Sequence, residues 1–102
     1  MAVKEKFYQL TPESLKNVIC DVAEMRKAKI TRPGGMLEVE MITEMYRIKT
    51  SYIFRMTREK TGTTLSIESG NGDDNSVEDV EFMFVILDGM IDPFKGHTVS
   101  IG

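Results

Sequence analysis

The stretch that decides the fold runs from residue 76 to residue 92 and reads Ser-Val-Glu-Asp-Val-Glu-Phe-Met-Phe-Val-Ile-Leu-Asp-Gly-Met-Ile-Asp. Its apolar run, residues 82–87, would by itself fit a buried strand. The acidic residues decide against a strand, because successive members are three, seven and four positions apart, which places them on one stripe of a helix. They are Glu78, Glu81, Asp88 and Asp92. We therefore predict a helix here, capped by Asn75 or Ser76.

The apolar side of this predicted helix is wider than one face of a sheet covers. It consists of Val77, Val80, Phe82, Met83, Phe84, Ile86, Leu87, Met90 and Ile91, with Val85 inside the acidic stripe. A large exposed apolar surface commonly marks a contact with another molecule. We therefore predict self-association into a homodimer through this helix. The predicted interface residues are Phe82, Phe84, Val85, Met90 and Ile91.

A strand and a second helix are predicted near the start of the chain, over residues 4–9 and 12–28. Thr11 is suited to cap the helix, and Pro12 takes the first helical position, where its missing N–H is not needed. Apolar residues then recur at the helical spacing. They are Leu15, Val18, Ile19, Val22, Ala23 and Met25.

Between the two helices the hydrophobic period changes to two, which indicates strands. The apolar positions are first odd and then even. They are Leu37, Val39 and Met41, followed by Tyr46, Ile48, Tyr52, Phe54 and Met56. Such a change of parity requires a turn or a bulge, and we predict a tight hairpin turn at residues 43–45. A second hairpin loop at residues 58–62 leads to a strand over residues 63–69.

These elements predict an α+β fold, a two-layer sandwich in which two helices cover one face of an antiparallel sheet of four to five strands. The predicted order is β-α-β-β-β-α, and residues 98–101 form either a short final strand or an ordered tail. The outer face of the sheet is expected to carry Glu38 and Glu40 beside Arg47, Lys49 and Arg55. A chain of 102 residues has room for one domain, with a flexible loop near residues 70–75 and a C-terminal tail over residues 93–102.

Composition and charge restrict the classes of partner. Thirteen basic residues against 16 acidic ones give a formal charge of −3, which disfavours nucleic acid and favours a basic or apolar protein surface. The single Cys20 cannot form an internal disulfide, so a reducing compartment, the cytoplasm, is expected. The longest apolar run has six residues, far fewer than a membrane span needs.

Residues with catalytic or metal-binding chemistry are present without the patterns that such chemistry needs. His97 is the only histidine, and no nucleophile or orienting partner is marked for it. Asp73, Asp74 and Asn75 lack the order of a calcium loop, and Cys20 has no cysteine or histidine partner at metal-ligand spacing. We therefore predict no catalytic, cofactor or metal site, and a protein that is not an enzyme.

The order of helix, three strands and helix resembles the double-stranded-RNA-binding domain. That family places a cluster of lysines at the start of its second helix to bind phosphates. The matching stretch here, residues 73–79, reads Asp-Asp-Asn-Ser-Val-Glu-Asp. The resemblance therefore extends to element order only. The acidic charge of residues 73–79 argues against binding to RNA.

The hairpin Gly-Thr-Thr-Leu-Ser-Ile-Glu at residues 62–68, together with the broad apolar helix that follows, resembles helix-grip domains of the Bet v 1/START-like class. In that class a curved sheet wraps a long C-terminal helix around an apolar cavity. The resemblance implies an alternative function, a small carrier or sensor of an apolar ligand. The pocket between sheet and helix would then be lined by Tyr46, Tyr52, Phe54, Met56 and Met83, with Phe82 and Met90 beside them.

Overall fold

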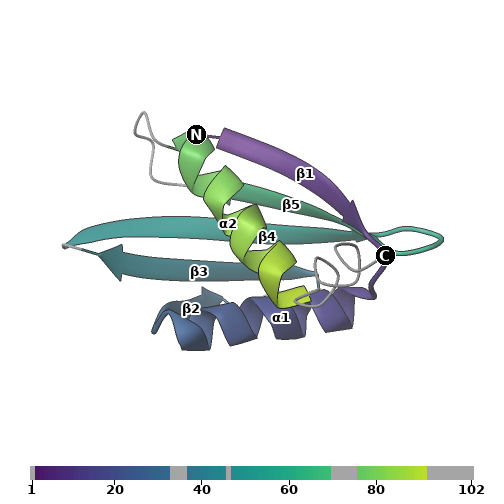
Figure 1. Cartoon of the computed structure of the whole chain (residues 1–102), viewed down its shortest axis with the longest axis horizontal. Helices are drawn as coiled ribbons and strands as arrows, with labels where there is room; N and C mark the ends of the chain where they lie inside the picture. The colour runs from purple at the N-terminus through teal and green to yellow at the C-terminus, as the bar shows by residue number, and fades with distance from the viewer. Residues whose placement is uncertain (1, 33–36, 46, 70–75, 92–102) are drawn as a thin grey trace, which may run out of the picture.

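A five-stranded antiparallel sheet with both helices on one face makes up the fold, as predicted (Figure 1). The structure is a computed structural model and describes residues 2–32, 37–45, 47–69 and 76–91. The elements are β1 (Ala2–Tyr8), α1 (Pro12–Met25), β2 (Lys29–Arg32), β3 (Glu38–Met45), β4 (Ile48–Arg58), β5 (Thr63–Ser69) and α2 (Ser76–Ile91). The strand order is β1-β5-β4-β3-β2, so β1 and β2 form the two edges. The predictions for Tyr46, His97, the loop at residues 70–75 and the tail at residues 93–102 lie outside the described residues.

Helix α1 ends at Met25, three residues before the predicted end, for a reason visible in its backbone. The N–H of Ala28 donates to the carbonyl of Ala23 at 2.7 Å, and the N–H of Lys27 donates to that of Glu24 at 3.2 Å. Lys27 has a φ of 55°. This is the Schellman motif, in which a left-handed residue reverses the chain after a helix. The chain then forms β2, a short edge strand that the sequence analysis missed.

The β3–β4 hairpin turns two residues later than predicted. Strand β3 continues to Met45, which pairs with Ile48, so the turn follows Met45 and includes Arg47. Arg47 has a φ of 68°, the left-handed backbone that two-residue hairpin loops require. This register sets Val39 opposite Phe54, which explains the change of parity seen in the sequence.

The core lies between the sheet and the two helices. Helix α1 contributes Leu15, Ile19 and Val22, and the sheet contributes Val39, Met41, Phe54, Leu65 and Ile67, all fully buried. The other face of the sheet is open and polar, as predicted. There Arg55 donates to Glu38 at 3.1 Å and to Glu68 at 2.8 Å. Val3 and Phe7 of β1, 55% and 45% exposed, are apolar exceptions on this face.

Candidate interaction surface on helix α2

Helix α2 has a buried side and an exposed side, and the exposed side is partly apolar. Val80, Met83 and Leu87 are buried against the sheet and α1. Phe82 and Val85 point away from the fold, with 53% and 65% of their surface exposed. Together with the exposed Gly89 they lie at positions i, i+3 and i+7, which share one line along a helix. We call Phe82, Val85 and Gly89 the α2 stripe.

Gly89 has no role that the described fold explains. A Cβ atom built on it would meet nothing within 4 Å among the described residues. Glycine inside a helix costs roughly 0.5–1 kcal/mol relative to alanine, because the unfolded chain loses more freedom when glycine becomes ordered. The helix therefore carries a destabilising residue on an exposed, apolar stripe without a local reason.

On one side of the α2 stripe, ion pairs join the helix to strand β1. Lys4 and Lys6 of β1 point to the helical face of the sheet, where their ammonium groups lie 3.0 Å from Glu81 and 2.5 Å from Asp88. The hydroxyl of Tyr8 also donates to Asp88, at 2.7 Å. Burial, and then this hydrogen bond, raise the pKa of Tyr8 far above its usual value, so the phenol stays neutral. These contacts hold one side of α2 next to strand β1.

On the other side of the stripe lies the C-terminal end of α1. The guanidinium carbon of Arg26 lies 5.2 Å from the centre of the Phe82 ring, a cation–π distance. The neighbouring Met25 is 60% exposed. Tyr52, near Arg26, is buried. Its pKa is raised to about 12, mainly by burial and to a smaller extent by the charge of Asp79, whereas the charge of Arg26 acts to lower it. Arg26 and Met25 thus extend the α2 stripe onto α1.

The predicted interface residues separate into two groups in the structure. Phe82 and Val85 are exposed, whereas Phe84 is only 9% exposed and points inward. Met90 and Ile91 are partly buried against the core. The sequence analysis missed Met25 and Gly89. Met25 lies at the last residue of α1, where the apolar side of the helix is no longer covered.

Four of the five predicted pocket residues lie together between the sheet and the helices. Tyr52, Phe54, Met56 and Met83 are all buried and belong to one core cluster. The rings of Tyr52 and Phe54 are 6.4 Å apart and tilted by 40°. The fifth residue, Tyr46, lies outside the described residues. The structure therefore brings these four side chains together as close neighbours in the core.

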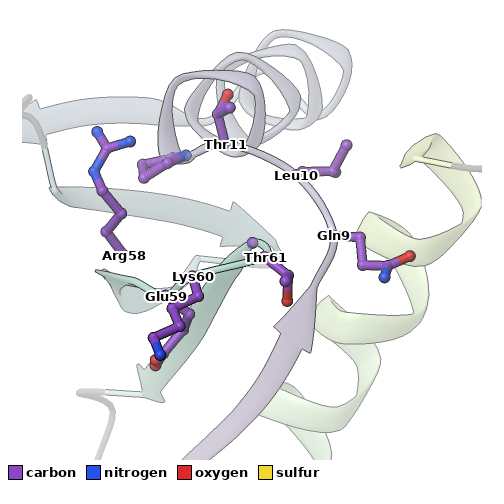
Figure 2. A pocket seen from close by; sticks show the side chains of 9 residues that line it. Gln9, Leu10, Thr11, Arg58, Glu59, Lys60 and Thr61 are labelled. Atoms are coloured by element: carbon purple, nitrogen blue, oxygen red, sulfur yellow. The ribbon is translucent and has the colours of Figure 1, made fainter.

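A pocket of about 410 Å³ opens at the end of the sheet, between the segment that joins β1 to α1 and the β4–β5 hairpin (Figure 2). It is lined by Gln9, Leu10, Thr11, Pro12, Arg58, Glu59, Lys60, Thr61 and Gly62. Its charged side chains are largely engaged elsewhere, since Arg58 binds Glu13 at 3.0 Å and Glu59 accepts from Thr64 at 2.9 Å. Its lining contains no histidine or cysteine, and we assign it no reaction.

Groups with catalytic or metal-binding chemistry remain scattered in the described part of the chain. Cys20 is exposed on α1. Among the described residues, no three His, Cys, Asp or Glu side chains come together where they would hold a metal ion. In the same residues neither helix has the length and apolar character needed to cross a membrane.

Comparison of the chain with protein-family models, with curated proteins and with solved structures found no match. The assignment of function therefore depends on the chemistry and geometry of the surface itself.

Proposed function

We propose that this chain is a non-catalytic interaction domain that forms a homodimer through the exposed side of α2. The observation that carries the proposal is the exposure of Phe82 and Val85 in the middle of α2, whereas Val80, Met83 and Leu87 of the same helix are buried. Met25, at the end of α1 and next in sequence to Arg26, is a third exposed apolar side chain. Exposed apolar side chains are a common feature of protein interfaces.

A second copy of the chain is the partner that we propose. Closed two-fold dimers are the commonest oligomers of soluble proteins, and in such a dimer the same patch on both copies makes the interface. The cytoplasm suits the domain, because the exposed Cys20 would be kept reduced there.

The expected dimer is weak, because the exposed apolar surface is small. Full burial of a side chain of this size contributes about 1.5–3 kcal/mol, and these side chains are already about half buried. Association costs at least about 4 kcal/mol in lost freedom of motion. At the favourable end of these ranges about 5 kcal/mol remains, which corresponds to a dissociation constant of roughly 0.2 mM, so the test covers concentrations from about 10 μM to 1 mM.

Sedimentation equilibrium over that concentration range tests the proposal. The wild-type chain should change from monomer to dimer, and Val85→Glu should remain a monomer throughout, because it places a charge at the centre of the interface. Asn17→Glu, which adds the same charge on the exposed side of α1, serves as the matched control and should dimerise as the wild type does. A wild-type chain that stays monomeric up to about 1 mM would refute the proposal.

The helix-grip alternative, a carrier or sensor of a small apolar ligand, is favoured by the gathering of Tyr52, Phe54, Met56 and Met83 between sheet and helix. Because these side chains pack within one core cluster, a ligand would have to displace some of them. Titration with a fluorescent fatty acid distinguishes the two functions. Saturable binding that Val85→Glu leaves unchanged would support the carrier, whereas the homodimer predicts no saturable site in the core.

A further inference from the structure

The sizes of the side chains along the α2 stripe decrease in one direction. Phe82 is large, Val85 is of intermediate size and Gly89 has no side chain, and all three are exposed on one line of the helix. Such a gradient is complementary to itself only when the second helix runs in the opposite direction. A parallel pair would set two phenylalanines against each other and leave a gap between two glycines.

We infer that two copies pack their α2 helices antiparallel, so that Phe82 of each copy lies against Gly89 of the other and the two Val85 side chains meet between them. This inference rests on the proposed homodimer and adds its orientation and contacts. It also gives Gly89 a role, since the absence of a Cβ leaves room for the ring of the second copy. In the described monomer nothing else accounts for a glycine at that position.

The charges around the stripe favour the same orientation. Arg26 lies over Phe82, so an antiparallel arrangement carries this guanidinium to the last turn of the second copy's α2. That turn has no basic residue of its own. Its final carbonyl groups form the negative end of the helix dipole, which attracts a cation.

A size exchange between the two positions tests the orientation. Gly89→Phe should raise the dissociation constant of the dimer roughly tenfold or more, because two phenylalanines then compete for one space. Phe82→Ala should also weaken the dimer, since it leaves a void. The double variant Phe82→Ala/Gly89→Phe restores one large and one small residue at each contact, so its dissociation constant should fall well below that of Gly89→Phe alone. Both positions are exposed, so the monomer should fold in every variant, which circular dichroism checks.

Disulfide cross-linking provides an independent test in a Cys20→Ser background. A mixture of Phe82→Cys and Gly89→Cys chains should form the mixed disulfide, because the antiparallel arrangement brings these two positions together. Asn17→Phe is the control for adding an exposed aromatic side chain and should leave dimerisation unchanged.

The possible outcomes separate this inference from the proposed function. If the wild type is a dimer that Val85→Glu disrupts, but the double variant is no tighter than Gly89→Phe and the mixed disulfide is absent, the antiparallel contact is refuted while the α2 homodimer stands. If the wild type is a monomer throughout, both are refuted. Recovery in the double variant together with the mixed disulfide supports the antiparallel contact.

Discussion

Asp88 joins helix α2 to strand β1, and removing its carboxylate tests how that joint is stabilised. It accepts a hydrogen bond from the Tyr8 hydroxyl at 2.7 Å and lies 2.5 Å from the Lys6 ammonium. The two contacts differ in their surroundings. Tyr8 is buried, whereas the side chains of Lys6 and Asp88 are 48% and 39% exposed. Water therefore screens the ion pair more than the hydrogen bond.

The expected magnitudes follow from this difference. A hydrogen bond from a buried donor to a charged acceptor contributes about 1.5–3 kcal/mol, and an exposed ion pair contributes about 0.2–1 kcal/mol. Asp88→Ala should therefore lower the free energy of unfolding by about 2–3 kcal/mol, because it leaves a phenol that is only 8% exposed without its acceptor. Tyr8→Phe should cost less, about 1–2 kcal/mol, since it removes the donor together with the bond.

Two double-mutant cycles measured by urea unfolding separate these contributions. One combines Asp88→Ala with Tyr8→Phe, and the other combines Asp88→Ala with Lys6→Met. Measurements at low micromolar concentration keep the chain monomeric, so that dimerisation does not contribute to the stability. The coupling energy should be about 1–2 kcal/mol for Tyr8 with Asp88 and below about 1 kcal/mol for Lys6 with Asp88. An equal or larger coupling for Lys6 would refute the assignment of the hydrogen bond as the main stabilising contact.

Three further predictions concern the backbone and the alkaline stability of the fold. Lys27→Gly should raise the free energy of unfolding by roughly 0.5–1 kcal/mol, because glycine adopts the φ of 55° without a steric cost; a lower stability in urea would contradict this. Gly62→Ala should lower the free energy of unfolding by more than about 2 kcal/mol, since the added Cβ would lie 2.0 Å from the carbonyl oxygen of Tyr8. Gly89→Ala in the monomer should instead raise it by about 0.5–1 kcal/mol, because a Cβ there meets no described atom within 4 Å. Equal effects of the two substitutions would show that the space around each glycine does not determine the change in stability. Tyr52 keeps its proton up to a pKa of about 12 in the folded chain and loses it near pH 10 when unfolded, so its contribution is complete below pH 10 and is lost from there to about pH 12. Over that pH range the free energy of unfolding of the wild type should fall about 2–3 kcal/mol further than that of Tyr52→Phe. If the two variants lost stability in parallel as the pH rises, the titration of Tyr52 would not be the cause.

The regular part of the fold was predictable because its patterns are long and consistent. Strand β5 occupies residues 63–69, the bounds expected from alternation between two turn signals. Helix α2 spans residues 76–91, which confirms that the spacing of the acidic residues outweighed the strand-like run at residues 82–87. In both cases several residues pointed to the same element, so no single substitution would have changed the prediction.

The misplaced boundaries share one physical cause. Helix α1 ends, and the β3–β4 hairpin turns, at residues with positive φ that are not glycine, Lys27 and Arg47. Sequence analysis associates left-handed backbone with glycine, asparagine or aspartate, so a lysine and an arginine in that conformation give no signal. The four residues of β2 contain one apolar side chain, Ile30, so they show no alternating pattern, which is why this edge strand was missed.

The candidate surface depended on the rotation of α2, which its own sequence does not determine. Apolar residues occur on almost every side of this helix, so the helical period alone leaves open which of them face the sheet. Contacts with strand β1 favour the observed rotation, because Lys4 and Lys6 there bind Glu81 and Asp88. These two acidic residues are seven positions apart and therefore occupy one side of the helix, as do the two alternate lysines on the strand. That match of charge and spacing was present in the sequence and was not used.

The same match explains why Phe82 and Val85 are exposed. A helix that simply buried its most apolar side would turn its acidic residues fully toward water. Here the lysines of β1 draw Glu81 and Asp88 to one flank of the helix, next to the sheet edge. The side left facing solvent then carries the α2 stripe, Phe82, Val85 and Gly89, in line with the exposed Glu78. We therefore expect the ion pairs and the apolar stripe to be coupled. If Lys4→Met/Lys6→Met loosens the orientation of α2, the dimer should weaken even though neither lysine lies on the α2 stripe, and unchanged dimerisation would show that core packing alone sets the rotation of the helix.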